Sequence, residues 1–170
     1  MFCKNLMRMV FFFLGLSLNL WNCIAVAETH DKPNIILLYT DDQGYGDVSC
    51  LNPKAKFQTP NMDRLSNEGL TFTNAHCSDT VCTPSRYGLL TGRYCWRTSL
   101  KTGVLGAEHP CLIEDNRITL ASLLRDQGYE TAMVGKWHLG MDFPGTPQNR
   151  DWTQPVQDMP LDKGFNYFYG

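Results

Sequence analysis

The chain has 170 residues, of which 43 % are hydrophobic and 19 % are charged, and its formal net charge is −2. This length suits about one domain of roughly 100–200 residues, and the composition excludes a disordered, collagen-like or coiled-coil chain. The near balance of 15 basic and 17 acidic residues lacks the basic surface typical of nucleic-acid binding, so no nucleic-acid partner is expected.

The first 27 residues have the pattern of a secretory signal peptide. Lys4 and Arg8 give a positive start, residues 9–20 are almost wholly apolar, and residues 25–27 (Ala-Val-Ala) offer small side chains to a signal peptidase. The apolar run is shorter than the about 20 residues that span a bilayer. We therefore expect cleavage after Ala27, no stable membrane span afterwards, and export to the periplasm, the extracellular space or the lysosome, depending on the organism.

Export places the remaining cysteines in an oxidising compartment. Five of them follow the signal peptide, namely Cys50, Cys77, Cys82, Cys95 and Cys111. An odd number leaves at least one thiol outside intramolecular disulfides. The simplest explanation is that the unpaired thiol is buried and inert, or that it forms an intermolecular disulfide. A zinc site is less favoured, because the sequence offers no second close pair of ligands. If Cys82 is set aside, the other four cysteines admit three pairings, between which the sequence does not choose.

Three segments after the signal peptide are predicted to be strands. Residues 34–40 form a short apolar run without alternation, as in a strand buried on both faces, residues 70–75 alternate, and residues 129–134 form a third strand. Predicted helices separate these strands, so the pattern indicates an α/β fold with a mostly parallel sheet flanked by helices.

The predicted helices begin and end at recognisable residues. Thr59 and Pro60 are suited to a helix start, and Gly69 ends that helix. Thr119 begins a further amphipathic helix that Gly128 ends, and Pro84 is well placed to begin a helix of its own.

Right-handed crossovers bring the ends of parallel strands to one edge of the sheet, where open α/β sheets bind ligands. The candidate residues expected near this edge are Asp41, Asp42, Cys82, Arg86, Lys136 and His138. Adjacent carboxylates suit Ca²⁺ or Mg²⁺, although an isolated acidic pair is also typical of a solvated turn. Lys and Arg beside such a metal suit a transferring phosphoryl or sulfuryl group. A thiolate, however, is a poor ligand for a hard cation.

The sequence resembles the type I sulfatases, which belong to the alkaline-phosphatase-like superfamily. Residues 82–86 (Cys-Thr-Pro-Ser-Arg) match the family's C-x-P-S-R motif and are followed by Leu-Leu-Thr-Gly-Arg at 89–93. Residues 41–47, 135–140 and 164–170 continue the resemblance in the family's order. It implies the N-terminal part of an alkaline-phosphatase-like domain, incomplete at its C-terminus.

The resemblance implies a role for each candidate residue. A separate maturation enzyme would oxidise Cys82 to formylglycine, which then serves as metal ligand and nucleophile. Asp41 and Asp42 would bind the metal, Ca²⁺ in preference to Mg²⁺. Arg86 would support the formylglycine hydrate and Lys136 would contact the sulfate. His138 would hydrogen-bond the hydrate and act as a base.

The implied activity is that of a sulfuric ester hydrolase, which releases sulfate from a sulfated carbohydrate or an aryl sulfate. Residues 28–170 are expected to be the N-terminal portion of its catalytic domain, as a fragment or a truncated gene product that is inactive alone. Further metal and sulfate ligands are expected beyond Gly170. Two alternatives are an inactive sulfatase-like product and a metal-dependent phosphodiesterase or phosphatase of the same superfamily. The latter enzymes normally carry Ser or Thr as nucleophile, so Cys82 argues against them.

Overall fold

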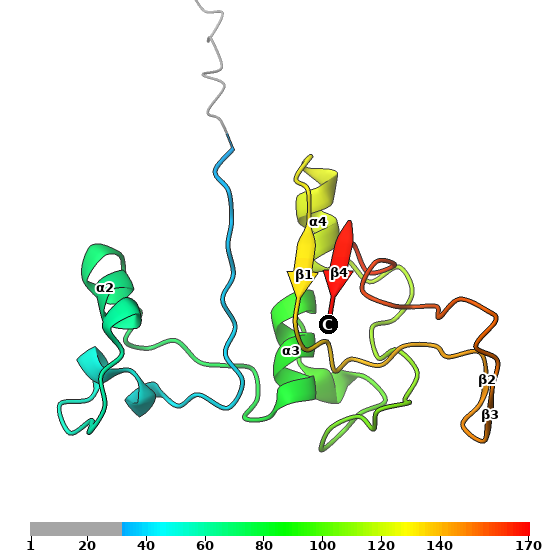
Figure 1. Ribbon diagram of the computed structural model, residues 1–170, viewed down its shortest axis with the longest axis horizontal. Coiled ribbons are helices and arrows are strands. Elements are labelled where there is room, and N and C mark those ends of the chain that lie inside the picture. Colours follow the sequence, from blue (N-terminus) through cyan, green and yellow to red (C-terminus); the bar gives the residue numbers. More distant parts are fainter. Residues whose placement is uncertain (1–31) are drawn as a thin grey trace, which may run out of the picture. The chain divides into compact units, whose positions relative to one another are not determined.

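The structure is a computed structural model that describes residues 32–170 (Figure 1). The predicted signal peptide, residues 1–27, lies outside the described residues. The chain divides after Tyr39 into two units, and all of the helices and strands named below belong to the second unit, Thr40–Gly170. No helix formed by residues 32–170 has the length and apolar character needed to cross a bilayer.

Three α-helices occur at or near the helix starts that the sequence indicates. The helix α2 spans Pro60–Glu68, α3 spans Cys82–Thr91 and α4 spans Leu120–Asp126. Thr119 caps α4, because its hydroxyl accepts a hydrogen bond from the Ser122 amide at 3.0 Å. Short 3-10 turns occupy Tyr45–Asp47, Ser49–Leu51 and Cys95–Arg97. The boundaries predicted for α2 and α4 are confirmed.

The helix predicted to start at Pro84 begins two residues earlier, at Cys82. The carbonyl of Val81 accepts the first helical hydrogen bond from the Ser85 amide at 3.2 Å. Pro84 is therefore the third helical residue, where the amide that proline lacks has no intrahelical partner in any case. As a result, Cys82 lies in the first turn of a helix.

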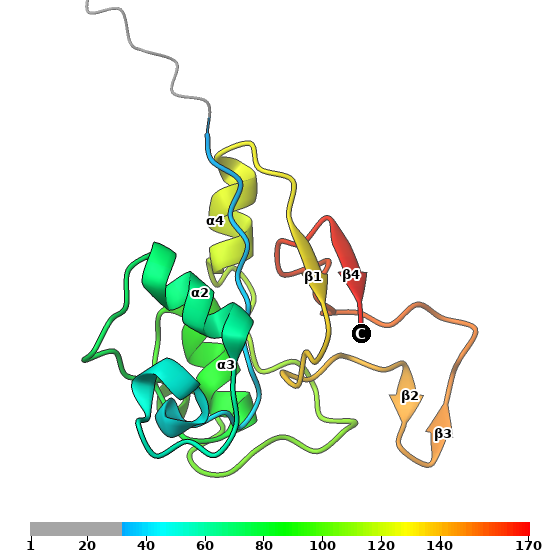
Figure 2. The same ribbon diagram turned by 60° about the vertical axis from the view of Figure 1, so that its left-hand side comes forward.

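The sheet in the described residues is smaller than predicted. Strand β1, Ala132–Val134, falls inside the predicted strand 129–134 and pairs in parallel with β4, Tyr167–Tyr169. The register joins Ala132 to Tyr167 and Val134 to Tyr169. Figure 2 shows these two strands side by side, with α4 next to β1. The parallel α/β class is thus confirmed, but β4 was not among the predicted strands.

Two predicted strands are wrong for the described residues. Residues 34–40 and 70–75 form no strand, and their apolar side chains are exposed, with Ile36 at 83 % and Leu70 at 78 %. A strand requires a neighbour that completes its backbone hydrogen bonds, and no described segment pairs with either stretch. Apolar composition alone therefore did not produce sheet structure here.

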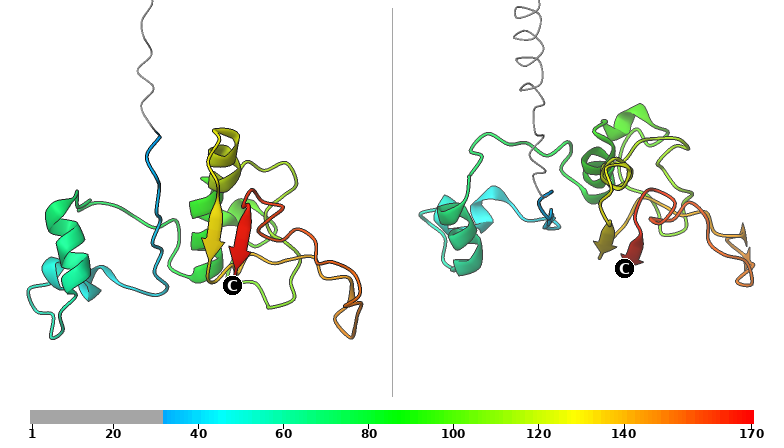
Figure 3. Two further views of the ribbon diagram at one scale, coloured as in Figure 1. Left: turned by 45° about the horizontal axis from the view of Figure 1, so that its top comes forward. Right: turned by 90° about the horizontal axis from the view of Figure 1, so that it is seen from above.

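The buried core lies between α3, the segments around residues 95–113 and the loop after β1. It consists of Tyr87, Cys95, Leu105, Leu112, Ile113, Trp137 and Leu139. The proline-rich stretch that follows forms a small antiparallel hairpin, β2 at Gly145–Thr146 and β3 at Asn149–Arg150 (Figure 3). The core thus fixes α3 and the β1 loop against each other.

The thiols of Cys50, Cys82, Cys95 and Cys111 are unbridged in the structure. None of the three disulfide pairings that the sequence allows is therefore present.

Candidate active site

The loop after β1 presents two of the predicted residues by simple alternation. Trp137 and Leu139 are buried in the core, whereas Lys136 is exposed and His138 between them is half-buried. The ends of the loop are fixed by backbone hydrogen bonds from Gly135 to the Tyr169 carbonyl and from Leu112 to the Leu139 carbonyl, both 2.8 Å. Burial of two apolar side chains thus positions the two polar ones.

A glycine allows the loop to turn directly afterwards. Gly140 has φ +79°, and a Cβ atom at this position would lie 2.1 Å from the Pro110 carbonyl oxygen. Only glycine accommodates both the left-handed backbone and this close approach. The Gly140 that follows Leu139 is therefore required by the path of the chain.

Helix α3 presents Cys82 and Arg86 one turn apart, on the same face. Cys82 is half-buried, whereas Arg86 is buried. The Arg86 guanidinium donates a hydrogen bond from Nη1 to the Lys136 carbonyl at 2.7 Å. This contact joins the first turns of α3 to the loop after β1.

Asp41 completes a cluster with the two cations. Lys136 Nζ donates to Asp41 Oδ2 at 2.6 Å, and Arg86 Nη2 lies 3.4 Å from Asp41 Oδ1. The hydrogen bond from Lys136 holds the pKa of Asp41 below its usual value of 3.8, and the Arg86 charge acts in the same direction. The same bond raises the pKa of Lys136, although burial acts in the opposite direction. One carboxylate and two cations are therefore charged together at neutral pH.

Asp42 follows Asp41 but is placed differently. It is exposed and has φ +56°, a left-handed conformation that Asp tolerates better than most residues. Within residues 32–170 no group of three or more His, Cys, Asp or Glu side chains is arranged to hold a metal ion. Carboxylate oxygens suit Ca²⁺, which takes six to eight oxygen ligands in all. The donors present are therefore of the type that a hard cation prefers, but they are too few to complete its coordination.

His138 is held by contacts that the sequence did not reveal. Its ring nitrogen Nε2 lies 3.0 Å from the Leu105 carbonyl oxygen, and its own carbonyl accepts a hydrogen bond from the Thr83 hydroxyl at 3.0 Å. Thr83 is completely buried. Thr83 lies within the Cys-Thr-Pro-Ser-Arg motif, but no spacing rule marks its hydroxyl as a partner of a residue 55 positions away.

The structure thus brings the predicted residues together to different degrees. Asp41, Arg86 and Lys136 are in direct contact. His138 is linked to α3 through Thr83, the neighbour of Cys82, and Asp42 remains on the surface beside Asp41.

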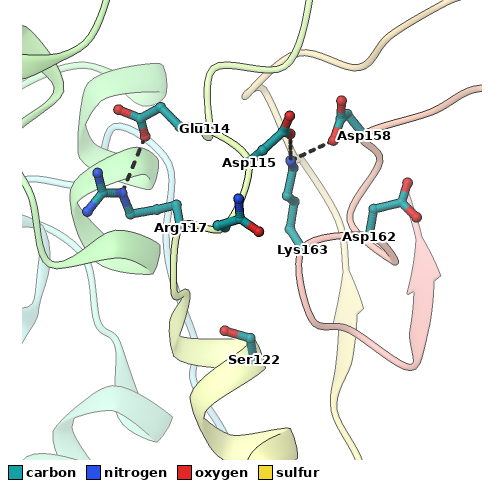
Figure 4. Close-up of a pocket in the computed structure, with 8 residues that line it drawn as sticks. Glu114, Asp115, Arg117, Ser122, Asp158, Asp162 and Lys163 are labelled. Carbon is teal, nitrogen blue, oxygen red and sulfur yellow. Dashed lines mark hydrogen bonds and ion pairs between the residues drawn. The ribbon is translucent and has the colours of Figure 1, made fainter.

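A second polar cluster contains none of the predicted residues. It lines a cavity of about 540 Å³, in which the buried Lys163 lies between Asp158, at 2.6 Å, and Asp115, at 3.8 Å (Figure 4). Burial is the largest single influence and lowers the pKa of Lys163, but the hydrogen bond to Asp158 together with the negative charges of Asp158 and Asp115 raises the pKa overall. A buried cation paired in this way is explained by its own carboxylate partners.

The chain is similar to known proteins over most of its length. The family model described as Sulfatase matches residues 33–170. The N-acetylgalactosamine-6-O-sulfatase of Bacteroides thetaiotaomicron is 42 % identical over 139 residues, which cover 81 % of this chain and 27 % of that protein. The steryl-sulfatase of Homo sapiens is 43 % identical over 151 residues, covering 85 % of this chain and 24 % of that protein.

Solved structures are similar as well. One comes from a study of the metabolism of multiple glycosaminoglycans by Bacteroides thetaiotaomicron, with a TM-score of 0.70 and 40 % identity over 81 % of this chain and 28 % of that one. Another is Ps i-CgsB in complex with k-i-k-neocarrahexaose, with a TM-score of 0.61 and 32 % identity over 82 % of this chain and 29 % of that one.

These matches place the chain in a class of proteins built on an α/β fold. The chain belongs to the sulfatase family. It spans about a quarter of the length of the curated relatives that it matches.

Proposed function

We propose that this chain supplies the nucleophile and the sulfate-binding cations of a sulfuric ester hydrolase. The observation that carries the proposal is the junction of α3 and the β1 loop. There Arg86 bonds to the Lys136 backbone, and both cations face one carboxylate beside the helix turn that begins with Cys82. Two fixed cations next to a helix N-terminus form a favourable environment for a sulfate ester.

Cys82 is the proposed nucleophile after its conversion to formylglycine. The conversion replaces sulfur by an aldehyde, whose hydrate offers an oxygen nucleophile and a harder metal ligand than a thiol. In the folded chain Thr83, Ser85 and Arg86 are all buried. A maturation enzyme that reads the motif therefore has to bind this segment before α3 packs against the core.

The neighbouring side chains have separate tasks in this proposal. Lys136, whose side chain is 44 % exposed, reaches the sulfate as a point charge. Arg86 is largely buried and bonded to the Lys136 carbonyl, so it holds the loop in place and supports the modified Cys82. His138 accepts a proton from the modified residue as a general base.

We further propose that Asp41 and Asp42 bind a divalent cation, Ca²⁺ in preference to Mg²⁺. Ca²⁺ tolerates irregular oxygen shells, whereas Mg²⁺ demands near-octahedral geometry. Both Asp41 oxygens now face cations, so metal binding would have to rearrange those contacts. Titration calorimetry of the purified protein with Ca²⁺ and with Mg²⁺ tests the preference.

The proposed substrates are sulfated carbohydrates. One relative is named for sulfated N-acetylgalactosamine, and one similar structure holds a neocarrahexaose. Because another relative is a steryl-sulfatase, a steryl sulfate is the alternative substrate that the test has to include. Turnover of a sulfated N-acetylgalactosamine, a carrageenan oligosaccharide, a steryl sulfate and an aryl sulfate should be compared at equal concentration. Preference for the steryl sulfate would overturn the carbohydrate assignment.

The proposed activity is tested on the whole catalytic domain, of which residues 28–170 are the proposed N-terminal portion, produced together with a formylglycine-generating enzyme. Mass spectrometry of the peptide containing Cys82 should show sulfur replaced by a carbonyl oxygen, and a hydrazide should label that peptide. The protein should hydrolyse an aryl sulfate much faster than the matching aryl phosphate, and Cys82→Ala should lose both labelling and turnover. An unmodified thiol in fully active protein, or a preference for the phosphate, would overturn the proposal.

We also propose that the protein is exported after cleavage of residues 1–27. Residues 28–170 are then the N-terminal portion of the catalytic domain. The pattern of residues 1–27 supports it. N-terminal sequencing of the exported protein should begin at Glu28, and recovery of the intact N-terminus from the cytosol would contradict it.

A further inference from the structure

A single buried hydroxyl connects the two segments that carry the proposed nucleophile and the proposed base. Thr83 Oγ1 donates to the His138 carbonyl at 3.0 Å and accepts from the Leu105 amide at 3.3 Å. Thr83 is 0 % exposed, so water cannot replace either bond. The hydroxyl uses its one proton for His138 and one lone pair for Leu105.

Leu105 in turn contacts the ring of His138. The Leu105 carbonyl oxygen lies 3.0 Å from His138 Nε2. A carbonyl oxygen can only accept, so this hydrogen bond requires the proton to be on Nε2. In the neutral ring the other nitrogen, Nδ1, is then an acceptor. Within the described residues the His138 Nδ1 atom is buried and has no hydrogen-bond partner.

The backbone of His138 needs this support. Its φ of +53° is left-handed, a conformation that non-glycine residues adopt only where the surroundings hold it. Its neighbours Trp137 and Leu139 are fixed by burial, and the bond from Thr83 holds the His138 carbonyl between them. The Leu105 carbonyl then determines which ring nitrogen carries the proton.

We propose that Thr83 is a positioning residue for His138, and that with Leu105 it holds the ring in the tautomer that leaves Nδ1 as the proton acceptor. This inference rests on the proposed function, in which His138 is the general base. It assigns a task to the variable position of the C-x-P-S-R motif, where the Thr83 hydroxyl orients the base from the residue next to the nucleophile.

The first experiment compares Thr83→Val with Thr83→Ser. Val keeps the shape but removes the hydroxyl, whereas Ser keeps the hydroxyl. With turnover normalised to the aldehyde content at Cys82, we expect Val to lower kcat about 10- to 100-fold, as for a misplaced catalytic group. KM should change less than about twofold, because substrate contacts remain. Ser should restore kcat to within about threefold of the original value.

Thr119→Val is the matched control. Thr119 is also buried, at 2 % exposure, and its hydroxyl also bonds a distant carbonyl, that of Lys163 at 2.6 Å. Thr119→Val should therefore lower the melting temperature without lowering kcat. If Thr83→Val keeps full kcat, or if Thr119→Val loses kcat to the same extent, the positioning role is wrong.

The second experiment reads the tautomer directly and does not require the conversion of Cys82. Nitrogen-15 NMR of histidine-labelled protein in the thiol form, with the His138 signal assigned by its loss in His138→Gln, should show the proton on Nε2. Thr83→Val should weaken that preference and Thr83→Ser should keep it. A proton on Nδ1 in the unsubstituted protein would overturn the inference. Absence of aldehyde and turnover with this tautomer intact would instead overturn the proposed function alone.

Discussion

The loop that carries Lys136 and the segment that precedes Asp41 differ in what holds them in place. Both contain apolar residues next to a charged residue of the site. In the loop, Trp137 and Leu139 are buried in the core. In the segment 34–40, Ile36 and Leu38 are exposed at 83 % and 77 %. Burial of Trp137 and Leu139 therefore anchors the loop, whereas Ile36 and Leu38 are largely exposed and provide no such anchor.

This difference implies that the site is not equally rigid on its two sides. Lys136 and His138 depend on buried hydrophobic contacts, whereas Asp41 depends on its ion pairs with Lys136 and Arg86. Buried contacts persist in salt, while ion pairs between partly exposed groups weaken. Substitutions in the two regions should therefore have effects of different size.

The largest effect is expected for Leu139→Ala. Leu139 is 0 % exposed, and removal of a fully buried leucine side chain costs about 2–5 kcal/mol of unfolding free energy. Turnover should fall as well, because Lys136 and His138 lose the buried side chain that anchors their loop. Urea unfolding and an aryl sulfate assay measure both effects. A loss below about 0.5 kcal/mol would show that the loop is not held by the core.

The next largest effect is expected for Asp41→Asn, and it concerns activity more than stability. The change removes the charge that Lys136 and Arg86 face, so turnover should fall about 100-fold, as when a preorganised charge is lost. The side chain is 41 % exposed, so the melting temperature at neutral pH should change little. Asp42→Asn is the companion variant. Normal turnover in both variants would show that Asp41 and Asp42 form only a solvated turn.

The same variant has a defined pH signature. The folded-state pKa of Asp41 is below 3.8 because of the hydrogen bond from Lys136. Its stabilising contribution is therefore complete above the unfolded pKa and is lost as the pH falls through the lower folded value. Asp41→Asn should flatten the acid limb of the stability curve below about pH 4. An unchanged acid limb would show that the ion pairs do not contribute to stability.

Two cysteines extend the comparison to chemical reactivity. Burial raises the pKa of Cys111 from 9.0 to about 11, whereas Cys50 is exposed. At pH 8 a thiol with such a raised pKa is only about 0.1 % thiolate, the reactive form. Iodoacetamide should therefore label Cys50 much faster than Cys111, as followed by mass spectrometry. Equal rates would show that the region around Cys111 opens readily.

The raised pKa of Cys111 also affects stability in alkali. The thiol ionises more readily in the unfolded chain, so stability should decline as the pH rises from 9 towards about 11. Cys111→Ala should reduce this decline in a pH series of urea unfolding curves. If stability declines equally in Cys111→Ala, other ionisable groups cause the decline.

The smallest effect is expected for Ile36→Ala. With Ile36 83 % exposed, the unfolding free energy should change by less than about 0.5 kcal/mol. This variant is the direct counterpart of Leu139→Ala. A loss of about 2 kcal/mol or more would show that residues 34–40 pack as the buried strand that the sequence predicted.

The sequence by itself determined the features that depend on neighbouring residues. Thr119 and Gly128 marked the ends of α4, and Pro60 and Gly69 those of α2, because caps and breakers act within a turn of the helix. The family motifs likewise identified Cys82, Arg86, Lys136 and His138 as candidates. Cys82 and Arg86 lie within helix α3, and Lys136 and His138 lie within the loop after β1.

Only the tertiary structure decided the features that depend on distant partners. The aromatic run at 167–169 became β4 because β1 pairs with it, whereas the more apolar residues 34–40 found no such partner among the described residues. The bond from Thr83 to the His138 carbonyl joins positions 55 residues apart. Strand pairing and buried polar contacts are satisfied across the fold, so local sequence does not fix them.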